Sequence, residues 1–135
     1  MRKKVAITMA GAIIVLTAGG NVFCILRGKM PYKDLKASDI VSATVYFFPP
    51  DKTVQITDVE ELVSYLGEVT IYNEDHSYND YCGQTVLFTL TMADGAQEKI
   101  TAFNPFVIIN GVGYKAKYEP CERLSRYANQ LLSAG

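Results

Sequence analysis

The sequence predicts an α+β protein with a single small domain. Its antiparallel sheet has about five to seven strands and two helices packed on one face, and an N-terminal hydrophobic helix precedes it. Three observations predict this arrangement. Residues 5–26 are apolar and uncharged, residues 39–117 contain short alternating runs separated by turn residues, and residues 57–67 and 119–132 carry apolar side chains at helical spacing. About a hundred residues follow the leader, which is enough for one hydrophobic core and too few for two.

The leader is typical of a membrane anchor. As a helix, residues 5–26 would be about 33 Å long, against a hydrocarbon core of about 30 Å. Basic residues 2–4 precede the segment, and Arg27 and Lys29 follow it. Because a short basic N-terminus tends to stay in the cytoplasm, we expect residues 1–29 to anchor a single-pass protein in the cell membrane, with its C-terminal domain outside.

Two other interpretations of the leader remain open. Residues 5–18 have the length of a signal-peptide core, and the small residues Ala18, Gly19 and Gly20 offer a cleavage site that would release a secreted protein near Gly20. Cys24 would be the modified residue of a lipoprotein, although the bulky Phe23 precedes it where lipoprotein signals carry a small residue. The domain is exported in all three cases.

After the leader, residues 30–38 read as a short polar linker and residues 39–132 as the extracytoplasmic domain. Alternation and turn residues predict strands at 39–48, 53–56, 69–72, 85–92, 99–103, 106–109 and 112–117. In the first of these, Val41, Ala43, Val45 and Phe47 share the inward face. Asn110 and Gly111 predict a tight hairpin, because both central residues of a type I′ turn need positive φ.

The two helices have recognisable boundaries. Thr57 and Glu60 form the pattern of a capping box, and Gly67 is expected to end the first helix in a left-handed conformation. The second helix is expected to open at Glu119 and Pro120, because proline is favoured at the first helical position. The expected buried stripes are Val59, Leu62, Val63 and Leu66 in the first helix, and Cys121, Leu124, either Tyr127 or Ala128, and Leu131 in the second.

Charge excludes one class of partner. Residues 29–135 carry nine Lys and Arg against fourteen Asp and Glu, and no base lies between Lys52 and Lys99, where there are nine acids. Such a surface repels phosphate backbones, so no nucleic-acid partner is expected. The acidic face either solvates the domain or meets a basic partner, a cation or a cationic wall polymer.

The polar loop 73–83 contains the candidate chemistry. Asp75, His76 and Asp80 lie close in sequence to Cys82, and a histidine beside a thiol favours the reactive thiolate. The alternate oxygen side chains from Asn73 to Asn79 resemble a calcium loop. However, Tyr78 and Gln84 stand where such a loop needs Gly and Glu, so neither a metal nor a cofactor is predicted.

Two further sets of residues are candidates for stability or binding. Cys82 and Cys121 are the two cysteines of an exported domain, and they would form its possible disulfide; the alternative is a buried Cys121 thiol on the second helix. Tyrosine provides contact area at low entropic cost, so a patch of tyrosines would make a binding surface. The candidates for such a patch are Tyr78, Tyr81, Tyr114 and Tyr118.

A family pattern runs through residues 38–132. It consists of Ile56-Thr57-Asp58 before a Leu/Val helix, Gly83, Val86-Leu87-Phe88, Asp94-Gly95, and Val107-Ile108-Ile109-Asn110-Gly111 with Tyr114. The chain resembles small exported or membrane-tethered domains of unknown function from Gram-positive bacteria. The resemblance implies an envelope location and carries no functional residues.

The expected function follows from these bounds. We expect a membrane-tethered interaction or sensing module without catalytic activity, which contacts the membrane through residues 5–26 and binds a protein or an envelope polymer. The alternative is an envelope enzyme or thiol-redox protein that uses Cys82 with His76.

Overall fold

The computed structural model describes residues 28–134. The predicted N-terminal helix, the cleavage site near Gly20 and Cys24 therefore lie outside the described residues. Within residues 28–134, no helix is both long enough and apolar enough to cross a membrane.

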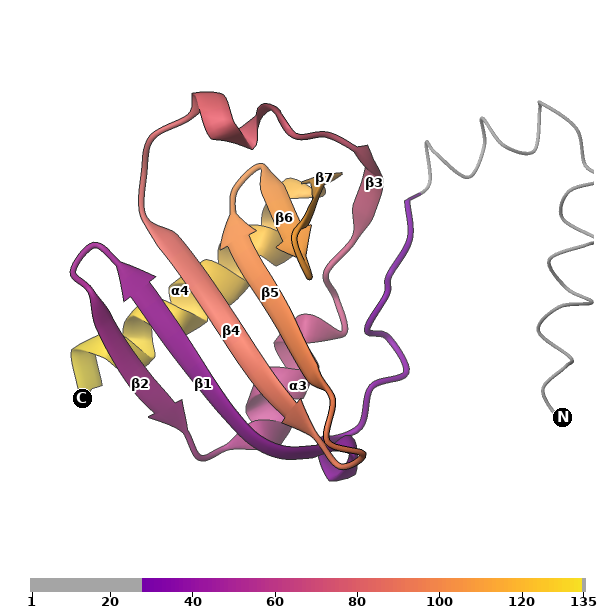
Figure 1. The fold of residues 1–135 in the computed structure, drawn as a ribbon, viewed down its shortest axis with the longest axis vertical. Helices are drawn as coiled ribbons and strands as arrows, with labels where there is room; N and C mark the ends of the chain where they lie inside the picture. Colours follow the sequence, from indigo (N-terminus) through magenta and orange to yellow (C-terminus); the bar gives the residue numbers. More distant parts are fainter. Residues whose placement is uncertain (1–27, 135) are drawn as a thin grey trace, which may run out of the picture.

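A seven-stranded sheet forms the centre of the domain (Figure 1). The strands are β1 (Ile40–Phe48), β2 (Lys52–Ile56), β3 (Ile71–Glu74), β4 (Thr85–Met92), β5 (Gln97–Phe103), β6 (Phe106–Ile109) and β7 (Val112–Ala116). Their order in the sheet is β2-β1-β4-β5-β6-β7-β3, and every neighbouring pair is antiparallel. The predicted α+β class and antiparallel sheet are confirmed. The β6–β7 turn has positive φ at Asn110 and Gly111, as predicted.

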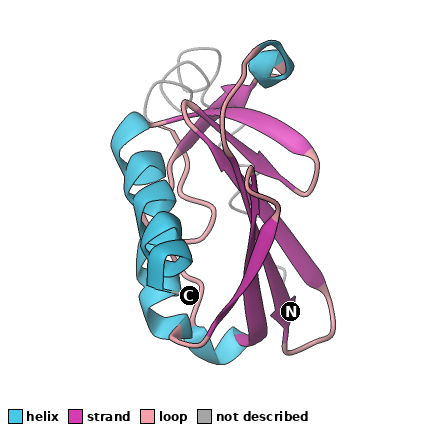
Figure 2. Cartoon of the chain, turned by 90° about the vertical axis from the view of Figure 1, so that its left-hand side faces the viewer, coloured by secondary structure: helices cyan, strands magenta, loops and turns pink. Residues whose placement is uncertain are grey.

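Two helices, α3 (Val59–Leu66) and α4 (Tyr118–Ala134), cover the same face of this sheet (Figure 2). Leu62 and Leu66 of α3 and Leu124 of α4 are fully buried, and they meet the inward side chains of the central strands. Those inward side chains are Ala43, Val45, Phe47, Val86, Phe88, Leu90, Ile100 and Ala102. The core therefore lies between the helices and one face of the sheet. Short 3₁₀ turns occur at η1 (Ala37–Asp39) and η2 (Ser77–Asp80) on other parts of the chain.

The helix termini differ from the sequence prediction. Asp58, rather than Thr57, caps α3, because its carboxylate accepts the amide hydrogen of Glu61 at 3.0 Å. The left-handed stop at Gly67 is also wrong, since Gly67 has φ −63° and ψ −21°. The helix ends instead in tighter turns that bring Val69 into the core. Helix α4 begins at Tyr118, so Pro120 is its third residue, still in the first turn where amides have no helical partner.

One strand residue faces the opposite way from its prediction. Ile40 pairs with Met92 and Ser42 with Thr91, so Val41 is an extra residue in a β-bulge. The bulge reverses the alternation, which leaves Val41 68% exposed and buries Ile40. Alternation alone does not reveal such an insertion, because the pattern from Val41 to Phe47 is continuous.

The segment predicted as a linker belongs to the folded domain. Lys29 pairs with Ile71 through two backbone hydrogen bonds, of 2.7 and 2.8 Å. Tyr32 is buried in the core, and its hydroxyl donates a hydrogen bond to Glu98 at 2.7 Å. Burial and the neighbouring carboxylate raise the pKa of Tyr32 well above its usual value. The buried ring and the β-pairing fix residues 28–38 against the sheet, so they do not act as a free spacer.

The bulge leads to a test with two valines of one strand. We expect Val45→Ala to lower the free energy of unfolding by about 2 kcal/mol, because Val45 is fully buried. Val41→Ala should change it by less than about 0.5 kcal/mol, because Val41 is exposed in the bulge. Urea denaturation of both variants measures the two free energies of unfolding. An equal decrease in both variants would contradict the bulge.

Candidate functional site: an aromatic groove on the open face

The β3–β4 connection shapes the helix-free face of the sheet. Strand β3 lies at one edge beside β7, whereas β4 lies between β1 and β5. Residues 75–84 must therefore pass over the ends of the intervening strands to return, and they arch above β6 and β5 in Figure 1. The open face at that end is partly covered by this loop.

The loop is fastened at its start to β7. The Asp75 amide donates to the Gly113 carbonyl at 2.9 Å, and the Asp75 carboxylate lies 3.9 Å from Lys115 Nζ. Asp75 Oδ1 also accepts the hydroxyl and the amide hydrogens of Ser77, at 2.7 and 2.9 Å. The Ser77 hydrogen bonds, assisted by Lys115, hold the pKa of Asp75 below its usual value. This carboxylate therefore has a structural role.

Aromatic rings pack between the loop and the sheet. The Phe106 side chain points away from the main core and is fully buried. The rings of Tyr78 and Tyr81 lie 6.2 and 5.3 Å from it, and Lys115 Nζ lies 5.6 Å above its centre. Gly113 makes room for this packing, because a Cβ atom there would lie 2.6 Å from Tyr78 Cε1.

A groove of about 580 Å³ opens beside this aromatic cluster. Its lining contains no charged side chain and consists of Phe48, Tyr78, Asn79, Tyr81, Cys82, Gly83, Thr85, Thr101, Phe103 and Ile108. Phe48 is 58% exposed and Tyr81 is 55% exposed, which are high values for large apolar side chains. The groove thus presents aromatic surface to solvent, with hydroxyl and amide groups among the rings.

The far end of the loop is fixed to both neighbouring elements. The Gln84 side chain donates to the Pro49 carbonyl at 3.2 Å and accepts from Asn129 of α4 at 3.0 Å. Gly83 has φ +152°, and a Cβ atom there would lie 3.3 Å from the Phe103 ring. The groove is therefore bounded by a loop that is anchored at both ends.

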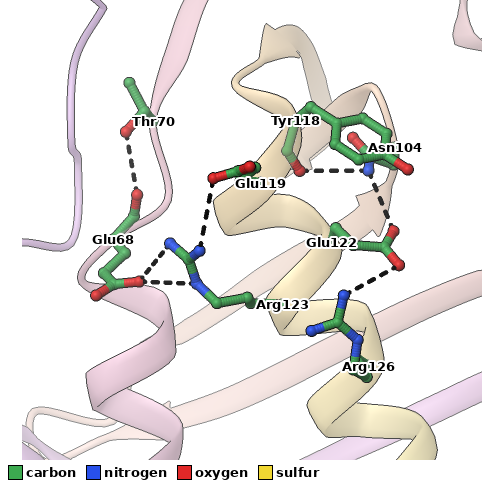
Figure 3. Close-up of polar contacts among 8 residues, drawn as sticks. All are labelled: Glu68, Thr70, Asn104, Tyr118, Glu119, Glu122, Arg123 and Arg126. Carbon is green, nitrogen blue, oxygen red and sulfur yellow. Dashed lines mark hydrogen bonds and ion pairs between the residues drawn. The ribbon is translucent and has the colours of Figure 1, made fainter.

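The four candidate tyrosines do not form one surface. Tyr78 and Tyr81 line the groove together. Tyr114 pairs with Val107 and packs on the core side of the sheet. Tyr118 is 61% exposed at the start of α4, where its carbonyl accepts a hydrogen bond from Asn104 (Figure 3).

The charged side chains near Tyr118 form ion pairs in which two arginines contact three glutamates. Arg123 contacts Glu68 at 2.8 Å and Glu119 at 4.0 Å, and Arg126 contacts Glu122 at 3.6 Å (Figure 3). The Arg123–Glu68 contact joins α4 to the end of α3. These pairs stabilise the helix face and leave no concentrated charge for a ligand.

The two domain cysteines are free thiols, so the possible disulfide is not formed in this structure. Cys82 is exposed in the groove, whereas Cys121 is buried on the helix side. The Cys121 thiol donates to the Phe106 carbonyl at 3.6 Å, which places strand β6 between it and the Phe106 ring. Burial raises the pKa of Cys121 to about 12.

The polar candidates of the loop are not arranged around the thiol. His76 contacts the Glu74 carboxylate at 3.4 Å and the Tyr78 ring at 6.0 Å, and Asp80 is exposed in η2. Within residues 28–134, no hydrogen bond links His76 to Cys82, and no group of three His, Cys, Asp or Glu residues is placed to hold a metal.

The sequence prediction did not include most of the groove floor. Phe48, Phe103 and Ile108 lie on the outward face of their strands, where the alternation predicts polar side chains. The available signal was the apolar run of residues 106–109, in which both faces of a short strand are apolar.

No family model matches this chain, and neither a curated protein nor a solved structure matches it.

Gly113 provides a test of the aromatic cluster. We expect Gly113→Ala to lower the free energy of unfolding by about 1–3 kcal/mol, because the added methyl would displace Tyr78 and the Asp75 carbonyl. Urea denaturation measures this cost, which should become smaller in a Tyr78→Ala background. An equal cost in both backgrounds would contradict the packing of Tyr78 on Gly113.

The thiols provide a second test. In the native protein we expect Cys82 to react fully with a maleimide, and Cys121 to react only after denaturation, because Cys121 is buried and its pKa is about 12. The test uses a Cys24→Ser background, because the chain has three cysteines, and intact-mass measurement with and without denaturant follows each modification. Loss of the modification of the native protein in a Cys82→Ser variant identifies Cys82 as the thiol that reacts. Resistance of both thiols to a maleimide in denaturant without reductant would show a disulfide instead.

Proposed function

We propose that this protein is a membrane-tethered, extracytoplasmic interaction or sensing module without catalytic activity. Residues 5–26 would hold it in the cell membrane, and the groove would bind a protein or an envelope component. The observation that carries the proposal is the exposure of Phe48 and Tyr81 at an uncharged aromatic groove.

Exposed aromatic surface at a concave site supports binding. Burying apolar area contributes about 25 cal/mol per Å², so a ligand that covers both rings gains several kcal/mol. Aromatic side chains are also enriched among the residues that dominate binding energy. The hydroxyls of Thr85 and Thr101 and the amide of Asn79 would then orient the ligand.

The surroundings of Cys82 favour binding over thiol chemistry. A nucleophilic thiol needs a base or a positive group nearby, and the described contacts of His76 are to Glu74 and Tyr78. A thiol-redox role for Cys82 remains the alternative function, since this side chain lines the groove.

Site-specific crosslinking tests the proposed function. In the full-length protein in intact membranes, we expect a photoreactive amino acid at Phe48 or Tyr81 to give a discrete adduct. The same probe at Tyr118 is the matched control, because Tyr118 is equally exposed and lies outside the groove. Protease and glycan-hydrolase digestion of the adduct distinguishes a protein from a polymer.

Two variants sharpen this test. Tyr81→Ala should lower the adduct yield at Phe48 about tenfold or more, as expected when an aromatic contact of the ligand is lost. Cys82→Ser keeps a side chain of similar size in the groove lining, so it should lower the yield much less than Tyr81→Ala does. Equal yields from Tyr118 and the groove would contradict the binding site, and loss of the adduct in Cys82→Ser would favour the thiol alternative.

A further inference from the structure

We propose that the edge of the domain next to Gly28 is a docking surface for the anionic headgroups of the membrane. This inference rests on the proposed function, because it needs the tether of residues 5–26. Its surface, the basic edge, is made by the chain that enters the domain and by the start of β3. It consists of Lys29, which pairs with Ile71, of Lys117, whose amide bonds to Thr70, and of Met30 and Lys33, which follow Lys29 in the chain. The entering chain runs past β3 at the end of the sheet in Figure 1.

The chain is fixed to β3 at the point where it enters the domain. Lys29 and Ile71 exchange two backbone hydrogen bonds, of 2.7 and 2.8 Å. Gly28 has φ +82°, and a Cβ atom there would lie 2.7 Å from Thr70 Cγ2 and 2.8 Å from Tyr72 Cε1. Only glycine combines a positive φ with the absence of a Cβ atom, so close packing against β3 defines where the chain enters the domain.

The length of chain before this point brings the domain to the bilayer. The predicted span ends at Leu26, and Gly28 is already packed on β3, so Arg27 is the single residue between them. Two extended residues reach about 7 Å, which is similar to the roughly 5–7.5 Å headgroup layer on each side of the bilayer. The edge at Gly28 must then lie at the membrane surface.

Charge favours this edge as the part that faces the lipids. Residues 28–38 carry three lysines and one aspartate, a net charge of +2. Residues 39–134 carry six Lys and Arg against thirteen Asp and Glu, a net charge of −7. Lys117 of the basic edge falls in the second group, so the rest of that group is still more acidic. An anionic surface attracts the lysines of the basic edge and repels the acidic remainder, which orients the domain with the basic edge toward the lipids.

The side chains of the basic edge suit a lipid interface. Lys29, Lys33 and Lys117 are exposed, and Met30 is 44% exposed. Lys117 belongs to this edge because its amide donates to the Thr70 carbonyl at 2.9 Å.

An acidic group near this edge is already compensated. The Glu68 carboxylate is held by Arg123 at 2.8 Å, and the Glu68 carbonyl accepts the Thr70 hydroxyl at 3.0 Å (Figure 3). Repulsion between Glu68 and the headgroups is thereby reduced.

Lysine footprinting tests the proposal on the unmodified full-length protein. The protein is placed in nanodiscs of phosphatidylglycerol or of phosphatidylcholine, and acetylation rates are measured for each lysine by mass spectrometry. Lys52 is the matched control, because it is exposed and lies on β2, at the opposite edge of the sheet from β3.

We expect phosphatidylglycerol to slow acetylation of Lys29, Lys33 and Lys117 about fivefold, the factor equivalent to the roughly 1 kcal/mol that a lysine gains near an anionic surface. High salt should reverse the protection, and acetylation of the control Lys52 should not change. A Lys29→Glu/Lys33→Glu variant should lose the protection of Lys117.

The outcomes separate this proposal from the proposed function. Equal labelling in the two lipids, with the protein embedded in the discs, would overturn the docking surface and leave the tether intact. Failure of the protein to enter either disc would overturn the tether and the docking surface together. Protection that appears only when a soluble acidic protein is added would identify that protein as the occupant and overturn the lipid assignment.

Discussion

The pairing of β3 with β7 is the constraint on which the rest of the structure depends. The chain leaves β2 at one edge of the sheet, passes through α3, and reaches the opposite edge at β3, where Ile71 lies against Ala116. It must then return to β4 in the middle of the sheet. The return loop covers Phe106 and creates the groove, while the outer side of β3 receives Lys29. One edge strand therefore fixes both the groove on the open face and the entry of the chain into the domain.

The two faces of the sheet differ in how they exclude water. On the helix side, long apolar stripes of α3 and α4 bury a continuous core. On the open side, Phe106 is covered by Tyr78 and Tyr81 of the loop and by the Lys115 ammonium of β7. The loop of residues 75–84 is long enough to bury the Phe106 ring, but it leaves Phe48 exposed to solvent. Unequal covering of the sheet is thus the physical origin of the groove.

Local sequence patterns predicted the helices and strands. The bulge, the packing of Tyr32 and the groove depend on contacts between residues far apart in the sequence, which these patterns do not contain. The sequence was sufficient to place both helices, the Asn110 turn and six strands to within about two residues. The third strand was predicted at 69–72 and lies two residues later, at Ile71–Glu74. The bulge at Val41 depends on register with β4, and the packing of Tyr32 depends on Glu98, which is 66 residues away. For the same reason the groove was predicted only through Tyr78 and Tyr81. Its floor combines four strands whose order the sequence does not state.

The proposed tether would restrict which partners the groove can meet. A module that searches for a distant ligand needs a flexible spacer, since the reach of a chain grows with its number of free residues. Here Tyr32 and Lys29 are packed into the domain, so the spacer has almost no free residues. Under the proposed anchor, the loop and the groove stay at a nearly constant height above the bilayer. The partner that this geometry favours is a component of the membrane surface or of the wall layer next to it. The groove offers two exposed rings and no charge, so its affinity for a partner would be modest. Holding the groove and the partner in the same thin layer would raise their local concentration and compensate for that modest affinity.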